Sequence, residues 1–306
     1  MTATSRALLL TIPLVLFAIG GVSYAPSTVQ TSEEADAPLA SLPPLPKWAS
    51  APLPDFSSYD DVTERKKAFF SFLYPRIVLA NSRILIEREY LEQLATQESL
   101  SAADTAWLKK QSERLRVKAE TGSPAQFEAL RKRLDVVPPS LVLAQAANES
   151  AWGQSRFATR GNNLFGQWCF SRGCGLVPKS RSEGADHEVA TFSSPYYSVR
   201  SYIQNLNRHS AYREVRELRS KQRNTGDGLS GTRLAGGLHS YSERGIDYIE
   251  EIRAMIRYNN LDFYDQQFRT LLGERTHTRF AELASAGTEK SLLPKDGQGV
   301  ATPFEG

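Results

Sequence analysis

The sequence predicts a mostly helical α+β domain, and three observations lead to this prediction. Several segments between residues 62 and 260 repeat apolar residues at helical spacing. The stretch 175–194 has the composition of two short strands around a turn. Only the N-terminal segment is continuously apolar, and 41% of all residues are apolar and 23% are charged, so the chain is typical of a globular core rather than a multi-span membrane protein.

The N-terminus carries an export signal. Arg6 precedes an uncharged apolar run from Ala7 to Val22, as in a secretory signal. We therefore predict that residues 1–25 are a signal peptide or an N-terminal anchor, with cleavage slightly preferred because the run is short and contains Pro13. Residues 7–22 are the membrane tether if no cleavage occurs. In both cases the protein is exported, to the periplasm or cell envelope.

Two segments are expected to lie outside the folded core. Residues 26–60 form a Pro-rich linker, since residues 26–54 hold seven of the sixteen prolines. Residues 285–306 are expected to form a flexible tail, because they are rich in Gly, Ser, Thr and Lys and show little apolar periodicity.

The first predicted helices lie in residues 61–137. Residues 62–97 predict a long amphipathic helix with a kink or break at Pro75. Ser101 with Asp104 makes a capping box for a second helix, and Ser123 followed by proline begins a shorter one.

A central helix is expected after Pro138, over residues 141–150, where small alanines allow close helix contacts. The last strong helix is predicted to begin at Ser242. Between them, residues 176–181 and 188–192 are expected to pair as a β-hairpin around the turn 182–186.

Glu149 is the main candidate for chemistry. A lone helical glutamate is usually a solvated surface residue. Here it ends the alanine-rich helix and precedes Trp152 and the turn containing Phe165. Such surroundings would partly desolvate the carboxyl and raise its pKa, so that it can hold a proton near neutral pH and act as a general acid.

The residues around Glu149 also resemble a known family. The string Ala-Ala-Asn-Glu-Ser-Ala-Trp-Gly-Gln-Ser at 146–155, followed by Asn-Asn-Leu-Phe-Gly at 162–166, resembles glycoside hydrolase family 73, the bacterial peptidoglycan glucosaminidase domain. The resemblance runs from about Pro138 to Asp262. The Lys-Lys-Ala-Phe-Phe sequence at 66–70 is similar to the Bax-type branch of that family.

This resemblance implies a lysozyme-like fold, with a catalytic domain at 138–284 on which residues 61–137 pack. It implies a peptidoglycan hydrolase, an endo-β-N-acetylglucosaminidase that cleaves the β-1,4 bond after N-acetylglucosamine, with Glu149 as proton donor. The alternatives are a muramidase or lytic transglycosylase acting on the other glycosidic bond, and a non-catalytic peptidoglycan-binding protein.

The family also implies a second carboxylate on the hairpin. The candidates are Glu183, Asp186 and Glu188. Glu183 is preferred because it lies at the predicted turn, where a side chain can lean over the substrate, and Glu188 is the alternative. Inversion, a covalent route and participation of the substrate acetamide all stay open at this point.

Substrate contacts are expected from aromatic and amide side chains. Tyr248 and Tyr241 match tyrosines that the family places beside the sugar, and Trp152 and Phe165 flank the acid, while core packing is an equal alternative for Trp152 and both tyrosines. Asn163 would bind a sugar hydroxyl or hold the turn before Phe165.

The remaining chemical features predict no cofactor and no metal. Cys169 and Cys174, the only cysteines of an exported chain, are a disulfide candidate, with zinc as the weak alternative. The four histidines lack metal-ligand spacing. A net charge of +3 gives no argument for nucleic acid, so peptidoglycan glycan strands are the expected partner. The sequence does not predict an oligomeric state.

Overall fold

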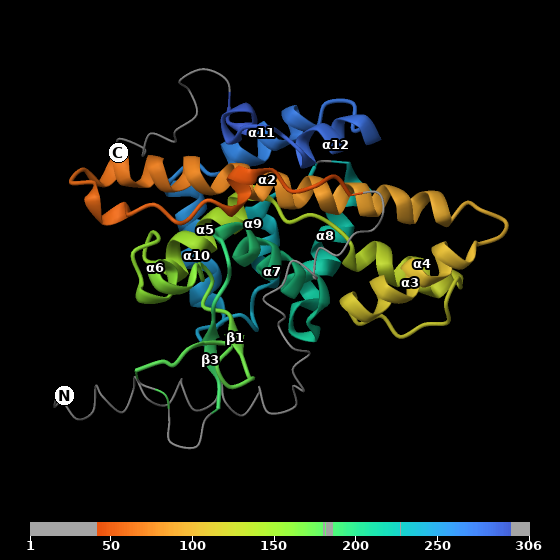
Figure 1. Cartoon of the computed structure of the whole chain (residues 1–306), viewed down its shortest axis with the longest axis horizontal. Coiled ribbons are helices and arrows are strands. Elements are labelled where there is room, and N and C mark those ends of the chain that lie inside the picture. Colours follow the sequence, from red (N-terminus) through yellow and green to blue (C-terminus); the bar gives the residue numbers. More distant parts are fainter. Residues whose placement is uncertain (1–41, 180, 182–185, 227, 295–306) are drawn as a thin grey trace.

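The long helix α2 (Val62–Leu94) crosses the molecule, and α4, α5, α7 and α12 pack along it (Figure 1). This computed structural model describes residues 42–294 except 180, 182–185 and 227, so the predicted signal or anchor lies outside the described residues. Helices α11 and α12 cover one side of α2, and α5, α7, α8, α9 and α10 lie on the other (Figure 1). The prediction of a mostly helical α+β fold is confirmed.

The bounds of the described elements are as follows. The further α-helices are α3 (Ala102–Leu115), α4 (Pro124–Arg133), α5 (Pro139–Ser150), α6 (Arg156–Gly161), α7 (Pro195–Arg208), α8 (Arg213–Thr225), α9 (Gly231–Leu234), α10 (Ile246–Tyr258), α11 (Asp262–Leu272) and α12 (His277–Ala284). Short 3₁₀ turns are η2 (Lys47–Ser50), η3 (Phe56–Ser58), η4 (Ser210–Tyr212), η5 (Ala235–Gly237) and η6 (Glu289–Leu292).

The middle of helix α2 is buried all round, whereas the sequence predicts an amphipathic helix with one exposed face. Residues 73–83 are buried on every side, because α5, α7 and α12 surround this part of the helix. The helix also continues through Pro75. Its length and apolar composition would be sufficient to cross a membrane, but 83% of the most apolar window is buried inside the protein, as expected of a core helix.

The caps at two helix starts agree with the prediction. Ser101 and Asp104 form a complete capping box at α3, and the Ser123 hydroxyl accepts the backbone N–H of Gln126 at α4. These two helices pack on the last turns of α2 and enclose a small core of their own. Its residues are Leu91, Leu94, Trp107, Leu108, Leu115, Phe127, Leu130 and Leu134.

The β structure differs from a simple hairpin. Three strands of two or three residues, β1 (Trp168–Cys169), β2 (Gly175–Leu176) and β3 (Glu188–Ala190), form an antiparallel sheet in the order β1-β3-β2. The pairing of β2 with β3 corresponds to the predicted hairpin, with Leu176 opposite Val189. The strands are shorter than predicted, and β1 was not foreseen because two residues carry no period-2 pattern.

The prediction of an extended linker is wrong for residues 42–60. Ala49 and Phe56 are each only 1% exposed, and the Trp48 indole N–H donates to the Ala286 carbonyl at 2.7 Å. The prediction of a flexible tail is likewise wrong for residues 285–294. Leu292 is buried there, and the Glu289 carboxylate lies 3.0 Å from the Arg76 guanidinium. Residues 42–60 and 285–294 therefore pack together against α2, although their compositions are typical of a linker and a tail.

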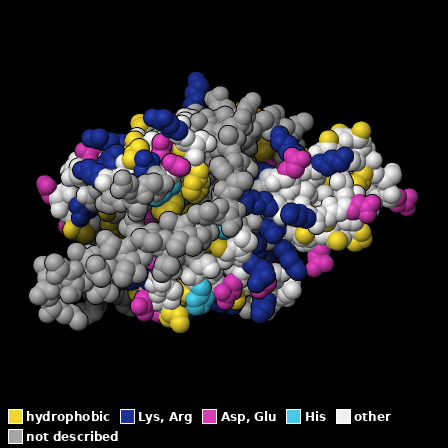
Figure 2. Space-filling model, turned by 90° about the horizontal axis from the view of Figure 1, so that it is seen from below, with side chains coloured by type: hydrophobic (Ala, Val, Ile, Leu, Met, Phe, Trp, Pro, Cys, Tyr) yellow, Lys and Arg dark blue, Asp and Glu magenta, His cyan; other side chains and the backbone are white. Residues whose placement is uncertain are grey.

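One face of the molecule carries charged side chains of both signs. Figure 2 shows Lys and Arg side chains gathered in the middle of one face, with Asp and Glu side chains among them. This mixture agrees with the small net charge of the chain.

A buried ion network joins α2, α8 and the segment that leads into α5. The Asp135 carboxylate accepts two hydrogen bonds from Arg223, at 2.7 and 3.1 Å, and lies 3.7 Å from Arg219 and 3.8 Å from Arg88. Burial opposes the ionisation of Asp135, but the three guanidinium groups outweigh it and lower its pKa to about 2.

We expect Asp135→Asn to lower the free energy of unfolding by about 3–5 kcal/mol, because it leaves buried guanidinium groups without their counter-charge. The folded-state pKa lies below the unfolded value, so the contribution of Asp135 is present above about pH 4 and is lost as the pH falls towards 2. Urea unfolding at several pH values should therefore show a shallower acid dependence in this variant. The exposed, hydrogen-bonded Asp55 is the control, and Asp55→Asn should change the stability little. Equal losses in the two variants would contradict this role of Asp135.

Candidate active site

Helix α5 positions Glu149, and it is buried on all sides over residues 139–147. Small residues at 144, 146 and 147 let α2, α10 and α11 approach closely. At the start of α5, the carboxylate of Asp265 accepts the backbone N–H of Ser140 at 2.8 Å, the Ser140 hydroxyl at 2.6 Å and the backbone N–H of Gly231 at 3.1 Å. The helix is therefore fixed at the end opposite Glu149.

Glu149 is half-buried in the last turn of α5 and is held by a chain of hydrogen bonds. The hydroxyl of Tyr248, on α10, donates to Glu149 Oε1 at 2.7 Å. Gln145, one turn earlier on α5, donates its Nε2 to the Tyr248 hydroxyl at 2.8 Å and accepts a hydrogen bond from the Tyr202 hydroxyl at its Oε1. Tyr202 lies on α7, so three helices fix one carboxylate oxygen.

The surroundings of Glu149 favour its protonated form. Burial raises the pKa of this carboxyl above its usual range, although the hydrogen bonds from Tyr248 and Asn148 oppose the shift. Burial, followed by the charge of Glu149, also raises the pKa of Tyr248, so the phenol stays protonated and remains a donor. A half-buried carboxyl with a raised pKa can deliver a proton to a leaving oxygen.

A charged pair beside Glu149 was missed in the sequence. Glu251 and Arg244 form an ion pair at 2.7 Å, and both act electrostatically on Glu149: Glu251 raises its pKa and Arg244 lowers it. For Glu251 the signal was the spacing from Tyr248, which lies three residues before it on the same face of α10. Arg244 precedes the helix, so helical spacing gives no signal for it.

The predicted aromatic residues stack beside the acid in different ways. Tyr241 lies parallel to Tyr248 with ring centroids 5.3 Å apart, and its hydroxyl donates to the Phe165 carbonyl at 3.3 Å. Phe165 stacks on Tyr202 at 4.0 Å and is only 3% exposed. This burial disfavours the expected contact of Phe165 with substrate, because its ring packs on Tyr202. Tyr241 stays partly exposed.

Asn163 holds a turn and has no capacity left for a sugar. Its Nδ2 donates to the carbonyls of Gln167 and Ala190, and its Oδ1 accepts the backbone N–H groups of Phe165 and Gln167. The side chain is 1% exposed. Of the two roles expected for Asn163, this favours holding the turn over binding a sugar hydroxyl, because the amide has two donors and two acceptor sites and all are occupied.

Trp152 projects from an unusual turn after α5. Ala151, Trp152 and Gly153 all have positive φ, at 50°, 59° and 78°. The turn presses the indole edge-on against Phe69 and Phe70 of α2, with centroids 5.8 and 5.4 Å apart. Trp152 remains partly exposed, so it packs on α2 and still reaches the surface.

The hairpin carboxylates give a mixed result. Glu183, the preferred second carboxylate, lies outside the described residues. The Glu188 carboxylate accepts the backbone N–H groups of Gly173 and Gly175 at 3.0 and 2.8 Å, which lower its pKa and tie it to the sheet. It therefore holds the loop together, which disfavours a role as base.

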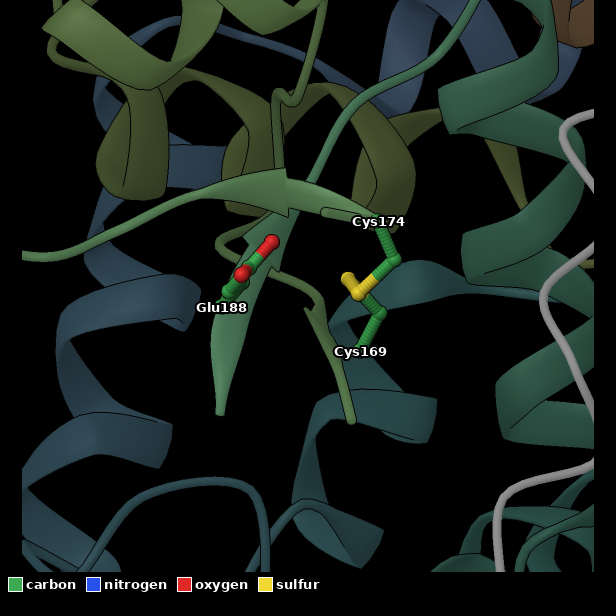
Figure 3. Close-up of side chains that lie close together, drawn as sticks. All are labelled: Cys169, Cys174 and Glu188. Atoms are coloured by element: carbon green, nitrogen blue, oxygen red, sulfur yellow. A yellow bond between two sulfur atoms is a disulfide. The ribbon is translucent and has the colours of Figure 1, made fainter. Parts of the chain in front are cut away.

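Cys169 and Cys174, the pair that the sequence predicts, form a disulfide beside Glu188 (Figure 3). The two sulfurs and the carboxylate lie within 4.8 Å of one another. Because the sulfurs are bonded to each other, they offer no thiolate to a metal ion. The disulfide joins β1 to the start of β2, and the loop between them supplies one of the N–H groups that Glu188 accepts.

Comparison with known proteins identifies the family. The family model Glucosaminidase, described as mannosyl-glycoprotein endo-beta-N-acetylglucosaminidase, matches residues 124–261. The chain is also 35% identical over 211 residues to "Protein bax" of Escherichia coli (strain K12), a match that covers 69% of this chain and 75% of the relative. The chain belongs to the glucosaminidase family, in its Bax-type branch. No solved structure matches it.

Family membership makes the chain a glycoside hydrolase. The matched segment contains Glu149, Tyr248 and the hairpin, but it begins after α2. The similarity to the Bax-type relative extends over a longer part of the chain than the family model.

The turn after Glu149 gives a test of how tightly this glucosaminidase is packed there. A Cβ at Gly153 would lie 2.6 Å from the Phe56 ring, whereas one at Gly166 would meet nothing within 4 Å, and both glycines have positive φ. We expect Gly166→Ala to destabilise the protein by about 1–2 kcal/mol, the cost of the left-handed conformation. Gly153→Ala should add about 1–3 kcal/mol for the collision. Urea unfolding measures both, and equal losses would contradict the packing of Phe56 on the turn.

Proposed function

We propose that the chain hydrolyses the β-1,4 bond after N-acetylglucosamine in peptidoglycan strands, with Glu149 as the general acid. The observation that carries the proposal is the half-buried Glu149 carboxyl, held by Tyr248 at one oxygen and given a raised pKa by burial. We assign the transferable proton to Oε2, because Oε1 already accepts from Tyr248. That proton goes to the glycosidic oxygen as its bond to the anomeric carbon breaks.

We keep Glu183 as the proposed base, which activates the water that attacks the anomeric carbon as the glycosidic bond breaks. Tyr248 and Tyr241 form a stack beside Glu149, and Tyr241 and Trp152 are partly exposed there. We propose that Tyr241 and Trp152 contact sugar faces, and that Tyr248 acts mainly by orienting the acid. If the substrate acetamide participates, no second carboxylate is needed, because Glu149, having given its proton to the leaving oxygen, can accept one from the water that opens the intermediate.

A peptidoglycan substrate places the enzyme outside the cytoplasm, which agrees with the export signal in residues 1–25. We propose a location in the periplasm or cell envelope, with residues 7–22 as a membrane tether if they are not removed. This glucosaminidase would then meet the polymer on the outer side of the cytoplasmic membrane.

We expect Glu149→Gln to reduce the cleavage of purified peptidoglycan by at least about 10²-fold, because the amide cannot donate the proton. The measurement is mass analysis of new chain ends after borohydride reduction. The full chain is the right enzyme for it, since residues 42–60 pack on the core. The control is Glu250→Gln, an exposed glutamate of α10 paired with Arg253, which should cleave normally.

The new ends decide between the alternatives. Reduced N-acetylglucosamine ends that disappear in Glu149→Gln support the proposal. Reduced or anhydro N-acetylmuramic acid ends would instead indicate a muramidase or a lytic transglycosylase. An absence of new ends from the wild-type chain, with pelleting on the polymer intact, would indicate a binding protein.

Tyr248→Phe should move the alkaline limb of the pH–rate profile to higher pH while lowering the maximal rate. The Tyr248 hydroxyl stabilises the Glu149 carboxylate, so its removal raises the pKa of Glu149 and keeps the acid protonated at higher pH. The lower rate follows from the loss of orientation. Tyr241→Phe is the control, because that hydroxyl donates to the Phe165 carbonyl, and its alkaline limb should stay in place. An unmoved limb in Tyr248→Phe would argue against Glu149 as the acid.

A further inference from the structure

Lys66 lies between two aromatic rings at the start of α2. Its Nζ is 5.0 Å from the centroid of the Trp152 ring and 4.9 Å from that of the Tyr258 ring. Trp152 belongs to the turn after α5, and Tyr258 is the last residue of α10. One ammonium group thus connects three segments that are far apart in the sequence.

No carboxylate among the described residues pairs with this ammonium. Its neighbour Lys67 forms an ion pair with Glu64 at 3.0 Å, whereas Lys66 makes no hydrogen bond or ion pair in the part of the chain that the structure describes. Burial, followed by the positive charge of Arg65, lowers the pKa of Lys66. The rings face the charge but accept none of its N–H groups in a full hydrogen bond, so this group can still bind an anion.

The group is accessible from solvent. Tyr258 is 56% exposed, and Lys66 and Trp152 are partly exposed. Val62, one turn before Lys66 on the same side of α2, is 52% exposed. Exposed apolar side chains around an unpaired cation are typical of a binding surface.

This surface is continuous with the proposed acid. Trp152 follows Glu149 by three residues. On α10, Tyr248 binds Glu149, and Tyr258 lies ten residues further along, a rise of about 15 Å. Tyr248, Glu251 and Tyr258 follow one stripe of this helix. A polymer that lies at Glu149 and runs along α10 therefore reaches Lys66 after a few sugar units.

We propose that Lys66, Trp152 and Tyr258 form a subsite for the stem peptide of peptidoglycan. The proposal rests on the proposed function, because the glycan must lie at Glu149. The carboxylates of this polymer are in its stem peptides, so an ammonium without a counter-ion selects the peptide rather than the uncharged sugars. The exposed Tyr258 ring provides apolar contacts to the peptide, and the Trp152 ring contacts the sugar that carries this peptide. Lys66 is thus a specificity-determining residue.

The test compares peptidoglycan with the same glycan strands after an amidase has removed the stem peptides and the lactyl carboxylates that this hydrolysis exposes have been converted to methylamides. We expect the wild-type chain to show the lower KM on peptide-bearing strands. Lys66→Met should raise that KM about tenfold, the loss of about 1.4 kcal/mol of binding, with kcat and the KM on peptide-free strands unchanged. Lys66→Arg keeps a cation over both rings and should retain the preference.

Lys67→Met is the matched control, since it removes the same charge from the next residue of α2, where Glu64 already neutralises it. A KM that rises equally on both substrates in Lys66→Met, or equally in the two methionine variants, would overturn the proposal. If the wild-type chain cleaves neither substrate, pelleting on the two polymers gives the same comparison. Weaker pelleting of Lys66→Met on peptide-bearing strands alone would then support the subsite while the proposed function fails. If Lys66→Met pellets less than the wild-type chain only on a phosphate-rich wall polymer, and equally on peptide-bearing strands, the stem-peptide subsite is overturned.

Discussion

The burial of α5 is the constraint on which the rest of the structure depends. A helix buried on every side over residues 139–147 must have its polar groups paired inside the protein, because no water reaches them. Asp265 meets this requirement at the first turn, where it accepts two N–H groups and a hydroxyl. Gln145 meets it in the middle, where both ends of its amide bind tyrosine hydroxyls. Only at the last turn does the helix reach the surface, and Glu149 lies there.

This arrangement gives Glu149 properties that the same residue would lack on an exposed helix. Because α5 is enclosed, Tyr248 and Tyr202 must approach it from α10 and α7, and their hydroxyls form one chain of hydrogen bonds that ends at Glu149. The packing that stabilises the core therefore also orients the carboxyl. Burial of the same carboxyl raises its pKa, so orientation and protonation have one physical cause.

Local features were predictable from the sequence, and features that depend on distant partners were not. The caps at Ser101 and Ser123 and the cysteine pair at 169 and 174 involve residues close in the chain, and the structure contains them. The roles of Asn163 and Phe165 depend on partners that include Ala190 and Tyr202, 27 and 37 residues later, so the sequence could neither decide between the two roles of Asn163 nor reveal the packing of Phe165. Residues 42–60 contain many prolines, yet they become part of the core because α2 needs a cover on that side. The resemblance identified Glu149 but could not reveal that Gln145 supports Tyr248.

The functional unit in this chain is larger than the segment that the family model matches. That segment begins at residue 124, yet Trp152 is packed against Phe69 and Phe70, and Phe56 closes over Gly153. Without α2 and the segment before it, the three residues with positive φ after Glu149 would lose the contacts that hold them in a strained conformation. The middle of α2 lies in the core, but its first residues reach the surface beside the segment that follows Glu149. There Lys66 faces Trp152 and Tyr258, whereas Lys67 pairs with Glu64 on α2 itself. The upstream helix therefore both supports the turn next to the acid and contributes a charge to the surface that surrounds it.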